Sequence, residues 1–179
     1  MPLPTATRGG PYYRVYNPAW IDPPDNTSHS KGAGGRWNPQ GAFGALYLNA
    51  TVLVAAAQAR FQHKDRAIKL FDLQPHARPM LATFDVDETV VVDAVDPAAV
   101  RALRLPVSFP FGVDHEPCRK IAQRANAAGI AGVATRSNAE ATRTTTVGEE
   151  LALFDTHPLP KQIGQGVAFA DWYPAPIPS

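Results

Sequence analysis

The sequence predicts an α+β domain whose twisted sheets, mixed or antiparallel, are flanked by helices. Strand-like and helix-like runs follow one another without a regular βα alternation, which is the pattern typical of this class. The chain also holds 18 prolines in 179 residues, about twice the average share. Because proline interrupts helices and central strands, we expect many short elements joined by ordered loops.

The length suits one domain with a core large enough to fold alone. We expect a single domain over 1–179, with its core at 12–155 and a C-terminal strand and proline-rich tail over 156–179. A polar connection at 136–149 is expected between two apolar strands. The last residues, 173–179, are expected to form an extended tail.

Apolar and β-branched runs predict the strands. In the first of them, YYRVYN, strict alternation places Tyr12, Arg14 and Tyr16 on one face. The opposite face then carries Tyr13 and Val15. Strands are predicted at 12–17, 45–49, 67–73, 79–95, 130–135, 150–155 and 166–172, with turns linking 67–73 to 79–95.

Start and stop signals mark the predicted helices. Asn49 or Thr51 can cap the first helix, whose apolar residues nearly surround it and predict that it is buried. Asp96 followed by Pro97 opens the second, and Gly129 ends the third. Helices are predicted at 51–64, 97–104 and 116–129.

Charge and cysteine content narrow the functional classes. The net charge of +1 and the lack of a dense run of Lys and Arg argue against a direct nucleic-acid binder. Cys118 is the only cysteine, so an internal disulfide cannot form and a reducing compartment is favoured. No signal peptide or membrane span is visible in the sequence, and we expect a cytoplasmic protein without a membrane role.

The stretch GAGGRWNPQGAFGALYLN at 32–49 predicts a loop built to approach an anion. Glycine allows close backbone approach, and the planar guanidinium of Arg36 suits phosphate or carboxylate. Gly35, Trp37 and Asn38 are the predicted substrate-binding residues of this loop. The alternative is a mobile surface loop whose Trp37 fills the core.

Five polar residues at the ends of apolar elements form the candidate catalytic set: Arg14, Arg36, Tyr47, Gln58 and Ser137. Such positions are where pockets collect polar groups. Two arginines can clamp a diphosphate, the tyrosine can stack or donate a hydrogen bond, and the serine can bind a phosphate or ribose oxygen. The simpler alternatives are an edge-strand arginine at position 14 and an ordinary polar helix residue at position 58.

Other reactive residues and glycines give weaker evidence for a functional site. The glycines at 32, 34 and 35 precede a proline turn and a strand, so they form neither a phosphate loop nor a dinucleotide fingerprint. The adjacent residues DHE at 114–116 diverge in direction, which argues against a metal site. A Cys118 and His115 pair suggests a nucleophile with its base, but a lone helical cysteine is more often a small buried group.

Several of these stretches together resemble the RES domain, a family named for an Arg, a Glu and a Ser. The matching stretches are YRVYNP, GGRWNP, ALYLN, GIAGVATRSN and EELALFD, and they extend over about 12–155. By motif, Arg14, Arg36, Tyr47 and Ser137 correspond to family residues. The resemblance implies a fold similar to that of ADP-ribosyltransferase toxins.

The resemblance also implies a function. RES proteins are toxins of bacterial toxin–antitoxin pairs, usually neutralised by a helix-turn-helix antitoxin. Their substrate is NAD, which they degrade by phosphorolysis or hydrolysis with release of nicotinamide. Inorganic phosphate is a co-substrate if the reaction is phosphorolysis, and no metal is expected. Some members transfer ADP-ribose to a protein. The resemblance leaves open whether the chain forms homo- or hetero-oligomers.

Two departures from the family pattern bear on activity. The helix glutamate of the family falls at Gln58, and an amide carries no charge and is no useful base at pH 7. The residue before Ser137 is Arg136 rather than proline, which adds a predicted substrate-binding charge. An NAD- or ADP-ribose-binding protein with little turnover, and a protein ADP-ribosyltransferase, therefore stay open as alternatives.

Overall fold

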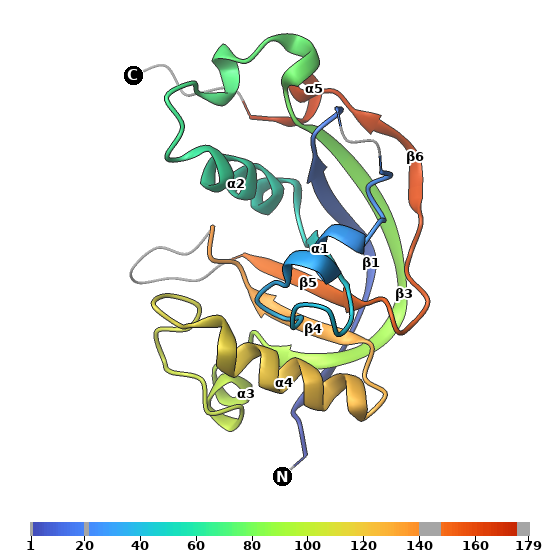
Figure 1. The fold of residues 1–179 in the computed structure, drawn as a ribbon, viewed down its shortest axis with the longest axis vertical. Coiled ribbons are helices and arrows are strands. Elements are labelled where there is room, and N and C mark those ends of the chain that lie inside the picture. The colour runs from blue at the N-terminus through green and yellow to red at the C-terminus, as the bar shows by residue number, and fades with distance from the viewer. Residues whose placement is uncertain (1, 20–21, 140–147, 175–179) are drawn as a thin grey trace.

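The computed structural model describes residues 2–19, 22–139 and 148–174, and its mixed α+β architecture confirms the predicted class (Figure 1). The strands are β1 (Thr5–Tyr16), β2 (Ala45–Asn49), β3 (Met80–Ala94), β4 (Gly132–Arg136), β5 (Glu149–Phe154) and β6 (Gln162–Val167). The α-helices are α1 (Ser28–Ala33), α2 (Val52–His63), α3 (Pro97–Ala102), α4 (His115–Ala127) and α5 (Phe169–Trp172), and two short 3-10 helices are η1 (Leu70–Asp72) and η2 (Pro75–Ala77).

The strands form one six-stranded sheet in the order β1-β2-β5-β4-β3-β6, and β1 also pairs with β3. That extra pairing connects β1, β2, β5, β4 and β3 into a closed circuit. All pairings are antiparallel except that of β3 with β4. The long strands β1 and β3 curve together along the whole molecule (Figure 1).

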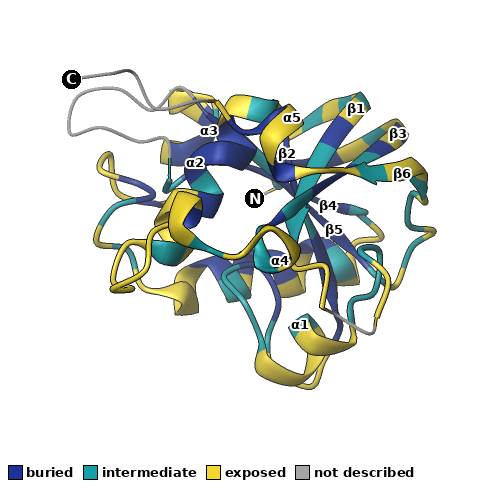
Figure 2. Ribbon diagram, turned by 90° about the horizontal axis from the view of Figure 1, so that it is seen from above, coloured by how far each residue is buried: buried dark blue, intermediate teal, exposed yellow. Residues whose placement is uncertain are grey.

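Three apolar clusters hold these elements together. The sheet packs against α3 and α4 through a cluster that includes Trp37, Phe109 and Phe154. The other face of the same strands carries a cluster with Tyr12, Leu48 and Leu151, in which β1, β2, β3, β4 and β5 all take part. The third cluster joins α2 and α5 to the N-terminal part of β3. Figure 2 shows β2, β4 and β5 largely buried, whereas β1, β3 and β6 carry many partly or fully exposed residues.

The start and stop signals of the helices work as predicted. The Thr51 hydroxyl accepts a hydrogen bond from the Val54 amide at 3.2 Å, so it caps α2. The Asp96 carboxylate accepts from the first amides of α3, where Pro97 stands at a first-turn position. Gly129 follows α4 with φ of +72°, a conformation that glycine adopts without strain. As expected, much of α2 is buried, namely Val54–Ala57 and Ala59, whereas Leu53 and Phe61 are exposed.

Two predicted strands are wrong wholly or in part. Segment 67–73 holds η1 instead, because Leu70 alone is buried there and one buried residue cannot supply the alternating face of a strand. In 166–172 the strand β6 ends at Val167 and α5 follows. Phe169 and Trp172 stand three residues apart and are both buried, which fits a helical turn rather than a strand.

The remaining elements include a strand that is longer than predicted and a helix that was not predicted. The predicted strand at 12–17 extends back to Thr5, where Gly9 and Gly10 accompany an irregularity in the ladder with β3. The predicted strand at 79–95 is confirmed as β3, which pairs with β1 from Met80 to Val92 with one register shift. Helix α1 has no buried residue, so it lacks the apolar periodicity by which sequence reveals a helix.

Parts of two predictions lie outside the described residues: positions 140–147 of the polar connection and positions 175–179 of the tail. Over the described part of the chain, no helix combines the length and the apolar character needed to cross a membrane.

Gly132→Ala is expected to destabilise the protein, because β5 passes very close to the start of β4. A Cβ atom at position 132 would collide with the carbonyl oxygen of Ala152, which belongs to the backbone and cannot turn away. Overpacking of this kind costs roughly 1–3 kcal/mol, and urea unfolding measures it. Gly32→Ala in α1 is the control, since the added atom meets nothing within 4 Å; a Gly132→Ala protein as stable as this control would contradict the close approach.

Candidate functional site

The glycine-rich loop before β2 is fastened by the Tyr47 hydroxyl. This hydroxyl accepts a hydrogen bond from the Trp37 amide at 3.0 Å and donates one to Asn38 Oδ1 at 2.8 Å. A Cβ atom at Gly35 would run into the Tyr47 hydroxyl oxygen and Asn38 Oδ1. Only glycine therefore lets the loop approach β2 so closely. Burial raises the pKa of Tyr47 to about 12, so the hydroxyl keeps its proton and its donor role.

Trp37 and Asn38 are core residues rather than an accessible ligand surface. Trp37 is 0% exposed and packs edge-on against Phe109, with ring centroids 6.1 Å apart. Asn38 is 0% exposed, and its amide nitrogen donates to the carbonyls of Ser30 and Phe43. Of the two sequence interpretations of Trp37, the structure supports the one in which it fills the core.

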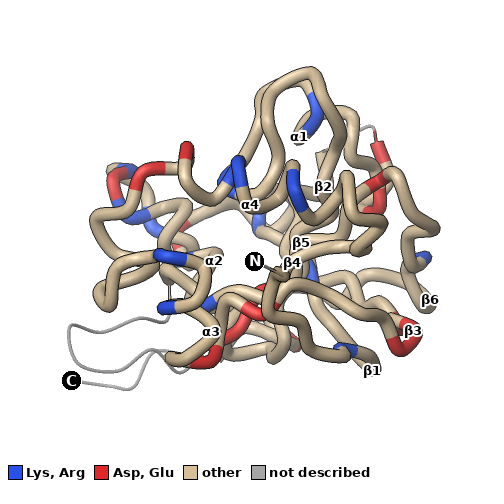
Figure 3. Tube along the Cα trace, turned by 90° about the horizontal axis from the view of Figure 1, so that it is seen from below, with Lys and Arg blue, Asp and Glu red and all other residues tan. Residues whose placement is uncertain are grey.

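Arg36 is held at the surface end of this loop. Its guanidinium donates to the Pro110 carbonyl at 3.3 Å and lies 5.8 Å from the centroid of the Phe109 ring. Beside it, Arg119 of α4 donates from Nε to the Gly35 carbonyl at 2.8 Å. Figure 3 shows Lys and Arg beside α1 and α4, whereas Asp and Glu mark β3. Two guanidinium groups near one glycine loop provide the donors that a phosphate needs.

Positive charge also acts on the neighbouring residues of α4. The pKa of His115 is lowered, first by burial and then by Arg36 and Arg119. Cys118 is fully buried, and burial raises the pKa of its thiol. A buried protonated thiol is a poor nucleophile, so the structure favours the interpretation of Cys118 as a small core residue.

Ser137 and Glu150 meet at the ends of β4 and β5. The Ser137 hydroxyl donates to Glu150 Oε1 at 2.6 Å, and Ser137 is itself 0% exposed. Strand register places Glu150 directly opposite Asn49 on one side and Thr135 on the other. Because paired residues share a face and the side-chain period is two, Tyr47 lies on this same face.

The pKa of the Glu150 carboxyl group is subject to opposing effects. Burial raises its pKa, while the Ser137 hydrogen bond and the charge of Arg36 act in the opposite direction. Among the described residues, no cation lies close enough to Glu150 to form an ion pair. We call Arg36, Tyr47, Thr135, Ser137 and Glu150 the Glu150 site.

Arg14 is not brought to this site. In the antiparallel pairing of β1 with β2, Tyr13 stands opposite Asn49, so Arg14 points to the face away from Tyr47. Its guanidinium donates to the Pro24 carbonyl, and burial lowers its pKa. Arg14 does share a face with Tyr12 and Tyr16, as alternation predicts, but that face belongs to another cluster. The expected clamp of Arg14 with Arg36 stays a prediction, which this register does not favour.

The remaining predicted site residues are Gln58 and Arg136. Gln58 is half-buried on α2, and its side chain makes no hydrogen bond to any residue that the structure describes. Arg136 donates from Nε to the Val95 carbonyl at 2.8 Å and from a terminal nitrogen to the Phe109 carbonyl at 3.3 Å. It thereby fastens the segment after β3 to β4.

Glu150 is the residue that sequence reasoning missed. Its signal was an acidic residue on the face of the predicted strand that carries Ala152 and Phe154, both of which are fully buried. The adjacent Glu149 faces the other way and forms a two-fold hydrogen-bonded ion pair with Arg8, at 2.7 and 3.1 Å. Nothing in the sequence alone separates these two glutamates except that alternation.

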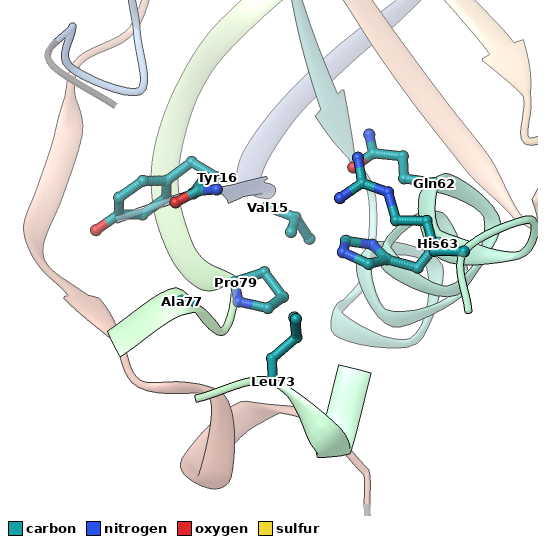
Figure 4. A pocket seen from close by; sticks show the side chains of 9 residues that line it. Val15, Tyr16, Gln62, His63, Leu73, Ala77 and Pro79 are labelled. Atoms are coloured by element: carbon teal, nitrogen blue, oxygen red, sulfur yellow. The ribbon is translucent and has the colours of Figure 1, made fainter. Parts of the chain in front are cut away.

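A cavity of about 290 Å³ lies elsewhere, between the end of β1 and the end of α2. Figure 4 shows Val15, Leu73 and Pro79 along its floor, with His63 and Tyr16 on opposite sides. None of the sequence-predicted site residues lines it. Within the described ranges, no group of three or more His, Cys, Asp or Glu side chains is arranged to hold a metal ion.

The RES domain family model matches residues 11–170. The chain belongs to the RES domain family. A solved structure, the MbcT–MbcA toxin–antitoxin complex of M. tuberculosis, contains a chain with a similar fold: the TM-score is 0.74 and the identity 23%, covering 92% of this chain and 86% of the other. No curated protein sequence matches this RES chain.

Glu150→Gln is expected to stabilise the protein at neutral pH. Because the folded state raises the pKa of Glu150 above its ordinary value of 4.5, the native state binds this proton more tightly. Stability is thus highest below that value and falls as pH rises through the raised pKa. The variant's advantage in Tm should appear at about pH 8 and vanish near about pH 4.

Glu149→Gln provides the matched contrast. It breaks the pair with Arg8, whose side chain is only 23% exposed, and should lower stability at neutral pH by about 1 kcal/mol. Equal effects of the two substitutions on Tm would contradict the different environments described for these neighbours.

Proposed function

We propose that this RES-domain protein is a toxin that degrades NAD and releases nicotinamide. The observation that carries the proposal is that one site of a RES fold holds both a partly exposed guanidinium, Arg36, and a carboxylate, Glu150, whose pKa Arg36 affects without an ion pair. NAD presents an anionic diphosphate at its centre and a cationic nicotinamide riboside at one end. A cation and an anion held apart match those two parts.

The proposed reaction requires no proton transfer to the leaving group. The nicotinamide ring of NAD is positively charged and departs as a neutral molecule, so it needs no general acid. The tasks are to hold the diphosphate, to position the nicotinamide riboside and to exclude water. Arg36 suits the first task because a guanidinium binds phosphate oxygens through two parallel hydrogen bonds.

Tyr47 and Ser137 have positioning roles in this proposal. The Tyr47 hydroxyl already holds the loop that carries Arg36, so the ring face, rather than the hydroxyl, is offered to the nicotinamide end. Ser137 fixes the Glu150 carboxyl group. Arg119 is the second guanidinium at the diphosphate, in place of Arg14.

Incubating purified protein with NAD, with and without inorganic phosphate, tests the proposal. Phosphorolysis yields nicotinamide and ADP-ribose 1″-phosphate, whereas hydrolysis yields nicotinamide and ADP-ribose. A labelled protein band after addition of cell extract would instead indicate an ADP-ribosyltransferase. NAD binding without nicotinamide release would favour the binding protein that the amide at position 58 suggests.

We also propose a neutralising partner. The similar fold in M. tuberculosis was solved as a toxin–antitoxin complex, and we infer that a helix-turn-helix antitoxin binds this chain. Co-expression with the product of an adjacent helix-turn-helix gene should yield a stable complex in size-exclusion chromatography and should suppress nicotinamide release.

Arg36→Ala is expected to abolish measurable NAD binding while leaving the fold intact, because the residue is partly exposed and its removal deletes the main phosphate donor. Isothermal titration calorimetry measures the affinity and circular dichroism the fold. Arg101→Ala, which removes an exposed arginine of α3, should bind as wild type does. Unchanged affinity in Arg36→Ala would remove Arg36 from the site.

Gln58→Glu is expected to raise nicotinamide release if α2 keeps the position that the family resemblance assigns to its glutamate. The physical reason is that a second negative charge stabilises the cationic sugar. Initial rates of nicotinamide release at saturating NAD provide the measurement. Unchanged or slower release would show that α2 contributes no carboxylate to this reaction.

A further inference from the structure

We propose that Glu150, on β5, is the catalytic carboxylate of this chain and acts where helix α2 offers only the amide of Gln58. The inference rests on the proposed NAD-degrading function and adds to it the group that stabilises the cationic sugar and receives the proton of an attacking water. It is carried by the placement of Glu150 among buried polar groups on an otherwise apolar face.

The buried polar side chains of the described chain are few and are concentrated on this face. They are Asn38, Asn49, Thr135 and Ser137, each at most 5% exposed. The last three adjoin Glu150: two through strand register and one through its hydrogen bond. The Thr135 hydroxyl has no hydrogen-bond partner among the described residues. A buried hydroxyl without a partner is costly in a purely structural site, and a bound ribose would supply the missing partner.

The two neighbouring glutamates of β5 show what a structural role looks like here. Glu149 is neutralised by Arg8 and also accepts a hydrogen bond from the Tyr12 hydroxyl at 3.2 Å. Glu150 accepts only from the neutral hydroxyl of Ser137 among the described residues. A carboxylate with no counter-ion among the described residues is available to a cationic substrate.

The groups that face Glu150 set its protonation. From the glycine-rich loop, Arg36 lowers the pKa of Glu150 without forming an ion pair, and Ser137 lowers it through the hydrogen bond. From β2, Tyr47 stays protonated and so adds no charge. From α4, Arg119 donates to the Gly35 carbonyl, and its charge acts on Tyr47. Burial outweighs these effects and moves the pKa of Glu150 upward, toward the range that suits a general base.

The reaction step balances with this one carboxylate. The bond between the nicotinamide nitrogen and the anomeric carbon of the ribose breaks, and its electron pair leaves with neutral nicotinamide. The Glu150 carboxylate stabilises the cationic carbon that remains. An oxygen of water or inorganic phosphate then bonds to that carbon. With water, one proton passes to Glu150 and on to solvent, which restores the carboxylate.

The pH dependence of kcat in Glu150→Gln and Glu149→Gln proteins tests this assignment. In wild type, kcat should rise with pH through the pKa of Glu150, since only the ionised carboxyl group acts. Glu150→Gln should lower kcat by roughly 10²–10⁴-fold, should lose the rising limb and should still bind NAD. Glu149→Gln should keep both kcat and the limb at temperatures where it is folded.

Two further variants keep the test decisive if Glu150→Gln folds poorly. Glu150→Asp retains the charge and should retain the rising limb at reduced kcat. Ser137→Ala removes the hydrogen bond that lowers the pKa of Glu150, so the limb should move to higher pH; a purely structural Ser137 would leave it in place.

The outcomes separate the inference from the proposed function. Wild-type protein that binds NAD but releases no nicotinamide would overturn the proposed degradation, and the catalytic role of Glu150 with it. Two other outcomes, in a wild-type protein that is active, would overturn only the assignment of Glu150. One is a Glu150→Gln protein as active as wild type, and the other is a rise of kcat with pH that Ser137→Ala does not shift.

Discussion

The hydrogen bond from Ser137 to Glu150 is the contact on which the candidate site depends. It links the end of β4 to the start of β5 and fixes a carboxyl group on the face that also carries Tyr47. The same face ends at the loop that presents Arg36, which the Tyr47 hydroxyl fastens in turn. Ser137 thus sets the position of the Glu150 carboxylate, and Tyr47 sets that of the loop that carries the Arg36 guanidinium. The proposed reaction needs both charges.

The groups proposed for function at this site lower the stability of the folded protein. Burial that raises the pKa of a carboxyl group destabilises the folded protein at neutral pH, and an orphaned hydroxyl at Thr135 adds to that cost. A fold selected only for stability would pair Glu150 as it pairs Glu149, with an arginine. Destabilising groups that cluster at one place are typical of sites that bind a ligand.

Sequence reasoning predicted the class, the family, most strands and the helices over 51–64, 97–104 and 116–129, because capping residues and apolar periodicity are local signals. It also predicted that Arg36, Tyr47 and Ser137 carry the site, which remains a proposal. It placed Arg14 with them because a motif gives a position in the chain, not the face of a sheet: a single register, Tyr13 opposite Asn49, turns Arg14 away. Glu150 escaped notice for the same reason, since only strand pairing brings it to Ser137.

A crystal structure of the Glu150→Gln protein with NAD tests the account most directly, because the substitution should slow cleavage and leave the dinucleotide intact. The account predicts the diphosphate on Arg36, with Arg119 beside it, and the anomeric carbon of the nicotinamide riboside next to the residue at position 150. A dinucleotide bound instead at Arg14, or in the cavity beside Val15 and His63, would contradict it.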